Sequence, residues 1–76
     1  MSKINLYPNP TKNLVTVAIP TELVNSNYSL IDQAGRTVMT GVLNNLNNSL
    51  DISALAKGLY IMQVGEQRLS LKLIKE

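Results

Sequence analysis

Residues 51–64 read DISALAKGLYIMQV, and they join two apolar strands through one compact turn. Up to Ile52, apolar and polar residues alternate, which is the period of a half-buried strand. Ser53 fits the cap of a short helical turn, because its hydroxyl can accept a free backbone N–H. Gly58 follows where the chain must leave that turn, and glycine reaches positive φ without steric cost. The run 59–64 is rich in strand-forming residues, so the stretch predicts strand, turn and strand.

Turn residues divide the rest of the chain into further short apolar runs. Pro8 and Pro10 stop the first run, since proline lacks a donor for a strand ladder. Gly35 supplies the positive φ that a hairpin needs. Gly41 lies inside a run and predicts a bulge or a close approach to the backbone. The expected strands cover residues 4–7, 14–19, 28–32, 37–43, 49–52, 59–64 and 68–73.

Seven short strands with turn signals about every eight to twelve residues predict an all-β fold. We expect a small antiparallel, immunoglobulin-like β-sandwich, and a small barrel is the alternative. Two of the connections carry further predictions. Residues 21–27 form a loop compatible with one helical turn from Thr21, and the asparagine-rich segment 44–48 favours a turn. The residues expected to be buried are Val15, Val17, Ile19, Tyr28, Leu30, Val38, Ile52, Leu55, Tyr60, Met62, Val64, Leu69, Leu71 and Leu73.

Composition excludes several classes of function. The chain has 76 residues, enough for one small domain, and a net charge of only +2. Its cations are scattered and its aromatic residues are three tyrosines, which argues against nucleic-acid binding. It contains no cysteine and no histidine, so the common catalytic triads and zinc sites are absent. We therefore expect no enzyme activity, no small-molecule substrate, no cofactor and no metal.

The acidic residues do not change that expectation. Asp32, Asp51, Glu22 and Glu66 lie in or beside predicted turns, and no two of them stand in a recognisable catalytic motif. The loops contain Asp and Asn but lack the spaced ligands of a calcium loop. Whether a loop binds calcium stays open at this stage.

Membrane-spanning and signal-peptide patterns bear on where the protein works in the cell. No run approaches the length of a membrane-spanning helix. Lys3 is followed by Ile-Asn-Leu-Tyr-Pro and not by the apolar core of a signal peptide. If the domain works outside the cell, we expect residues 1–76 to be a single domain from a larger precursor.

Four segments in order resemble one family. They are LYPNP at 6–10 followed by NLVTV at 13–17, YSLIDQAGRTV at 28–38, LDISALAKGLY at 50–60 and LKLIK at 71–75. Each is weak alone, but together they span nearly the whole chain. The sequence thus resembles the C-terminal sorting domain of type IX secretion cargo, the Por secretion system.

The resemblance implies a sorting signal and not an enzyme. Such domains carry an upstream cargo through the periplasm to the outer membrane, the cell surface or the extracellular space. The implied partners are the translocon, shuttle and sortase components, and a sortase-like protease usually removes the domain after export. The resemblance implies no nucleic-acid partner. The domain itself would be a monomer or a weak edge-strand dimer. A carbohydrate- or protein-binding β-sandwich module of a secreted enzyme is the alternative function.

Recognition residues are expected within the resembling segments. Each candidate also has a plain structural explanation as a turn, core or solvated residue. Lys72 should point to solvent, whereas Lys75 and Glu76 should contribute little packing beyond the last core leucine. The candidates are Pro8, Asn9, Pro10, Gly35, Arg36, Gly58, Tyr60, Lys72 and Lys75.

Overall fold

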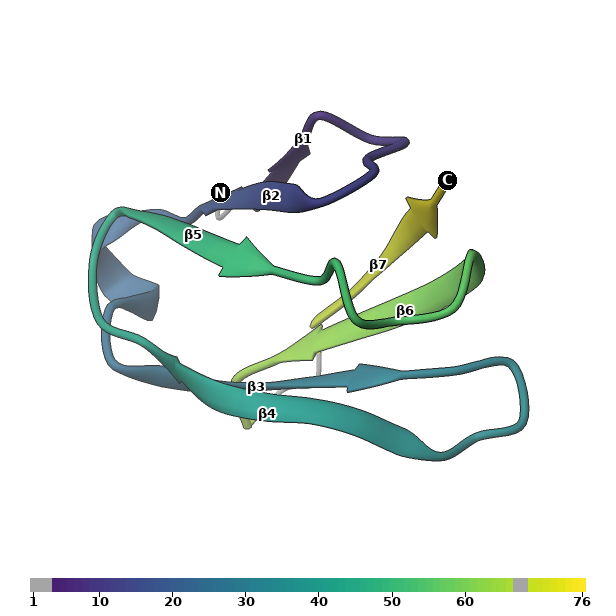
Figure 1. Cartoon of the computed structure of the whole chain (residues 1–76). Coiled ribbons are helices and arrows are strands. Elements are labelled where there is room, and N and C mark those ends of the chain that lie inside the picture. The colour runs from purple at the N-terminus through teal and green to yellow at the C-terminus, as the bar shows by residue number, and fades with distance from the viewer. Residues whose placement is uncertain (1–3, 67–68) are drawn as a thin grey trace.

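The computed structural model describes residues 4–66 and 69–76, which form seven strands and a single-turn 3-10 helix (Figure 1). No helix in this described part of the chain is long and apolar enough to cross a membrane. Every predicted strand is present with small shifts at its ends, except that the predicted start of the last strand, residue 68, lies outside the described residues. The helical turn at Thr21 is confirmed. The elements are β1 (Asn5–Tyr7), β2 (Leu14–Ala18), η1 (Thr21–Leu23), β3 (Ser26–Ile31), β4 (Thr37–Leu43), β5 (Asn47–Asp51), β6 (Gly58–Val64) and β7 (Leu69–Lys75).

The strands form two antiparallel sheets. One has the order β1-β2-β5 and the other β4-β3-β6-β7. The smaller sheet lies over the larger one, as Figure 1 shows. The predicted antiparallel sandwich is therefore confirmed, and the barrel alternative is wrong.

The core lies between the sheets and follows the period of two along the strands. Leu30 and Met62, which are register partners on β3 and β6, are fully buried. Ile52, in the stretch 51–64, is also fully buried. Burying a side chain of this size stabilises a fold by about 1.5–3 kcal/mol. The buried apolar residues are Val15, Val17, Ile19, Tyr28, Leu30, Leu43, Ile52, Tyr60, Met62, Val64 and Leu73.

The predicted inward face of β4 is wrong. Val38 was expected in the core but is 37% exposed, whereas Leu43 is fully buried. The pairing of β3 with β4 shifts between Leu30 and Ile31, so that Val38 is an extra residue in β4. This strand has apolar residues on both faces, so its period does not select a face. Alternation from the inward Leu43 and Met39 then places Val38 on the outward face, together with Val42.

Three other predicted core leucines are only half-buried. Leu55 packs against the core from the turn before β6. Leu69 and Leu71 lie on β7, at the edge of the larger sheet, where they line a shallow depression together with Ile4. The smaller sheet is narrower than the larger one, so it covers this edge incompletely.

Gly41 and the asparagine-rich connection each have a specific structural role. A Cβ at Gly41 would lie 2.8 Å from Cε2 of Tyr28, so the close-approach prediction is correct, although the approaching group is a ring. Asn47 and Asn48 belong to β5, contrary to the predicted turn over 44–48. The buried Asn48 side chain donates to the carbonyl of Asn45 (2.7 Å) and accepts from its amide (3.2 Å). It thereby closes a turn that is shorter than expected.

Candidate functional site

The four resembling segments meet at one end of the sandwich. In Figure 1 the three loops β1–β2, β3–β4 and β5–β6 and the C-terminus all lie on the right. We call this region the motif end and define it as residues 8–13, 32–36, 51–58 and 72–76. Hydrogen bonds join the first segment to the third and the fourth, and a shared surface depression joins the second to the third. Segments far apart in sequence thus form one surface.

The turn after β1 is fastened to the exposed edge of β7. The amide nitrogen of the Asn9 side chain donates to the carbonyl of Lys72 (2.9 Å), and the backbone amide of Ile74 donates to Oδ1 of Asn9 (3.0 Å). The Asn9 amide therefore pairs with β7 as another strand would. Thr11 continues this pairing, since its backbone amide donates to Ile74 (2.9 Å) and its carbonyl accepts from Glu76 (2.8 Å). The Tyr7–Pro8 and Asn9–Pro10 peptide bonds are both cis.

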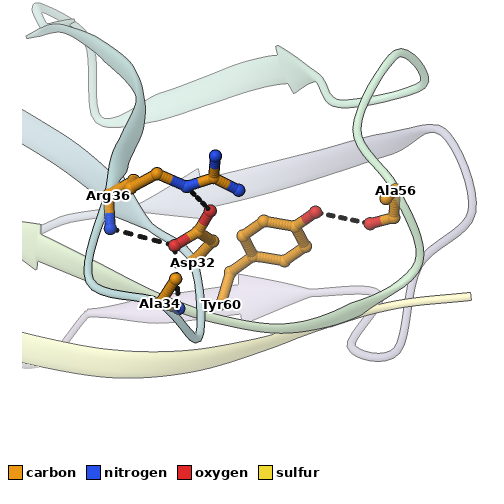
Figure 2. A network of polar contacts seen from close by, with 5 residues as sticks. All are labelled: Asp32, Ala34, Arg36, Ala56 and Tyr60. Atoms are coloured by element: carbon orange, nitrogen blue, oxygen red, sulfur yellow. Dashed lines mark hydrogen bonds and ion pairs between the residues drawn. The ribbon is translucent and has the colours of Figure 1, made fainter.

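Asp32 organises the hairpin turn between β3 and β4. Its Oδ1 accepts from the backbone amides of Ala34 (3.0 Å) and Arg36 (2.9 Å), and its Oδ2 accepts from Nε of Arg36 (3.1 Å), as Figure 2 shows. Gly35 has φ of +86°, which confirms the predicted hairpin geometry. The backbone hydrogen bond from Arg36 lowers the pKa of Asp32, partial desolvation opposes this, and the Arg36 charge lowers it further.

The turn before β6 differs from the sequence prediction. Ser53 does not cap a helix, because no helix forms there among the described residues. Its backbone amide donates to Oδ1 of Asp51 (2.9 Å), so the aspartate and not the serine organises the turn. Hydrogen bonds from the side chain and backbone of Ser53 lower the pKa of Asp51. Ile52 donates to the carbonyl of Asn13 (2.8 Å), and Gly58 has the predicted positive φ, at +149°.

Tyr60 is a core residue that also supports this turn. Its ring is buried, and its hydroxyl donates to the carbonyl of Ala56 (Figure 2). An open depression of about 290 Å³ lies between the hairpin turn and residues 56–60, and its lining includes Arg36 and Lys57.

Of the other two tyrosines, Tyr28 is buried as well, and burial raises its pKa. Tyr7 is 49% exposed.

The C-terminal residues are better fixed than expected. Lys72 is exposed, as predicted. However, Lys75 is half-buried and pairs with Gly58, and Glu76 donates its backbone amide to Thr11. The prediction of little packing is therefore wrong for Lys75, whereas Glu76 is exposed and is held by its backbone hydrogen bond to the turn after β1.

The motif end is basic and offers little for catalysis. Within residues 4–66 and 69–76, the one ion pair joins Arg36 to Asp32. The two carboxylates of the turns, Asp32 and Asp51, already accept hydrogen bonds from their own turns. The described residues contain no group of three or more potential metal ligands of the His, Cys, Asp or Glu type. The cations of this end are Lys12, Arg36, Lys57, Lys72 and Lys75.

The sequence located these candidates but missed the interactions that join them. The Asp-x-x-Gly spacing at 32–35 was a usable sign of an aspartate-organised turn. No feature of the sequence indicated the pairing of Asn9 with β7, because Asn9 and Lys72 lie 63 residues apart in the chain. Candidates with roles inside the fold are Asn9, Gly35, Gly58, Tyr60 and Lys75.

Comparison with known proteins gives the family. No curated protein matches the chain. Residues 5–76 match the family described as "Secretion system C-terminal sorting domain", and the match includes every segment of the motif end. Domains of this family are C-terminal sorting signals of type IX secretion, which implies an upstream cargo and a secreted or cell-surface protein that crosses the periplasm. The chain therefore belongs to the secretion system C-terminal sorting domain family.

Proposed function

We propose that this domain directs an upstream cargo from the periplasm through the outer-membrane translocon of type IX secretion. A sortase-like protease then removes the domain, which has no catalytic role of its own. The family match supports a sorting signal, and the proposal adds the translocon, the shuttle components and the cleavage step.

The observation that carries this proposal is the meeting of four distant segments at the motif end. Residues 8–13 hydrogen-bond to 72–76, and 32–36 share a depression with 51–58. A receptor that binds this surface would read the folded domain and not a linear peptide. If the domain folds before it is exported, the receptor must recognise its folded surface.

The candidate recognition residues divide by the part that they play in the fold. Pro8, Pro10, Arg36 and Lys72 are exposed and available for contact. The others have roles within the fold, so we propose that they shape the surface: Asn9 pairs with β7, Gly35 and Gly58 supply positive φ, Tyr60 is buried and Lys75 pairs with Gly58. Surface cations would steer the encounter with an acidic receptor, an effect that salt weakens.

The alternative, a carbohydrate-binding module, has weaker support. Sugar sites use exposed aromatic rings, because ring faces stack on apolar sugar surface. Tyr28 and Tyr60 are buried, which leaves Tyr7 as the exposed tyrosine of the chain.

Export of a reporter tests the proposal. A signal peptide, a reporter and this domain are expressed in a host with type IX secretion, and surface and periplasmic reporter are measured. We expect Lys72→Ala to hold the reporter in the periplasm at an unchanged melting temperature, and Lys72→Arg to restore export. Surface display of a reporter that lacks the domain would refute the sorting function. Full export by Lys72→Ala would remove Lys72 from the recognition surface.

A further inference from the structure

The larger sheet has an outer face that is apolar toward the motif end. Leu30 on β3, Met62 on β6 and Leu73 on β7 are fully buried, so their neighbours along each strand point outward. Those outward neighbours include Ile31, Ile61 and Ile74.

These side chains are close neighbours across the strands. Ile31 is the register partner of Ile61, and Ile61 is the register partner of Lys72. Leu59 and Ile74 form the next outward pair toward the motif end. Cross-strand partners on one face lie about 4.5–5.5 Å apart at Cβ, so the group is contiguous. We call Ile31, Leu59, Ile61 and Ile74 the outer patch.

The outer face of the smaller sheet is different in character. There the register partners Tyr7, Thr16 and Ser49 form one row, and the Tyr7 hydroxyl reaches Oδ1 of Asn47 (3.4 Å). Leu14, which is 54% exposed, lies on this face too, but its register partner is Asp51 and not another apolar residue. A polar outer face is ordinary for a sheet that meets water. The outer face of the larger sheet differs because it groups four apolar side chains, Ile74 exposed and Ile31, Leu59 and Ile61 half-buried, and grouped apolar area on a small protein marks an interaction site.

Cations border the outer patch. Lys72 lies within it as the partner of Ile61. Lys57 and Arg36 line the same depression as Leu59. Since the one ion pair among residues 4–66 and 69–76 is that of Arg36 with Asp32, Lys57 and Lys72 keep their charge uncompensated.

We propose that the outer patch is the docking surface for a protein of the export machinery that presents an apolar surface with an acidic rim. This inference rests on the proposed sorting function and deepens it, since it moves the main contact from the turns to a sheet face. Charge complementarity favours such a partner. A second copy of this chain would place Lys72 and Lys57 near like charges, which is unfavourable. Half-buried side chains on a sheet face suit a protein surface better than insertion into lipid.

Three variants test the proposal with the reporter fusion. Ile31→Thr/Ile61→Thr removes apolar area and keeps β-branched residues that suit strands. Lys72→Glu reverses the rim charge at an exposed position. Val42→Thr is the matched control, because Val42 is 51% exposed on the same sheet but lies at the end away from the motif end.

Each variant is assayed for far-UV circular dichroism, melting temperature, surface reporter and binding to the detergent-solubilised translocon. We expect the double variant and Lys72→Glu to stay folded but to bind about tenfold more weakly or worse, with export reduced in parallel. Val42→Thr should match the wild type. Added salt should weaken wild-type binding.

Other outcomes would overturn the proposal in distinct ways. Full export by both folded variants removes the outer patch from docking and leaves the sorting function intact. Failure of the wild-type domain to export the reporter refutes the sorting function itself. A wild-type dimer that the double variant converts to monomer would assign the patch to a second copy. Loss of binding to phosphatidylglycerol vesicles in the double variant would assign it to a membrane.

Discussion

Replacement of Asn9 by alanine tests whether the segment 6–10 acts in fold stability or in receptor recognition. The Asn9 side chain makes two hydrogen bonds to β7, a donation to Lys72 (2.9 Å) and an acceptance from Ile74 (3.0 Å). Alanine removes both and leaves the edge of β7 to water. The segment 8–13 then keeps only its Thr11 backbone pairing with that strand.

The expected loss is moderate. An intramolecular hydrogen bond contributes about 0.5–1.5 kcal/mol to stability. Asn9 is exposed, so water can satisfy the freed backbone groups of Lys72 and Ile74. For the two hydrogen bonds together we therefore expect a loss of unfolding free energy of about 1–2 kcal/mol. For a domain of this size, each kcal/mol lowers the melting temperature by about 4–8 °C.

Urea unfolding measures this difference, with the slope of the transition as a check on two-state behaviour. Asn13→Ala is the matched control in the same turn, because Asn13 contributes its backbone carbonyl to Ile52 and alanine retains it. Asn9→Asp should not rescue stability, since it keeps the acceptor for Ile74 but turns an oxygen toward the Lys72 carbonyl. An unchanged unfolding midpoint for Asn9→Ala, together with lost export, would refute the structural role and place Asn9 in receptor contact.

Three further predictions concern stability. Leu73→Ala should cost about 2–5 kcal/mol because Leu73 is fully buried, and Leu71→Ala should cost less, about 2 kcal/mol or below, because Leu71 is half-buried; urea midpoints of the two variants in the reverse order would contradict this. Gly58→Ala should destabilise by about 1–3 kcal/mol through backbone strain at φ +149°, and an unchanged melting temperature would show that the turn relaxes freely. The pKa of Asp32 is lowered in the folded state, so its contribution is present above the ordinary value of 3.8 and is lost as the pH falls below it; Asp32→Asn should flatten that acid decline.

The sequence alone predicted the features that depend on neighbouring residues. Alternation along β2 and β6 identified buried residues such as Val15 and Met62, because the pleat alone assigns side chains to faces. Positive φ at Gly35 and Gly58 followed from the turns they occupy. These inferences need only the local chain, which is why they were confirmed.

The features that the sequence did not predict depend on distant partners. Val38 was expected to be buried but is exposed, because pairing with β3 and not the pattern within β4 selects the inward face of this strand. Asn48 joined β5 because its side chain closes the turn to Asn45, which propensity alone does not require. The outer patch was invisible for the same reason, since Ile31 and Ile61 become neighbours only when β3 pairs with β6.

The C-terminal segment shows why stability and recognition must be measured together in such a domain. A stop after Ile74 removes the side chains of Lys75 and Glu76, but it also removes the pairing of Lys75 with Gly58 and the donation of Glu76 to Thr11. Loss of export by that truncation therefore has two explanations, a lost charge and a loosened β7. Lys72→Ala changes an exposed side chain and retains the Lys72 carbonyl that Asn9 binds. Because Lys72→Ala, unlike the truncation, leaves the backbone pairing intact, its export phenotype can be assigned to recognition.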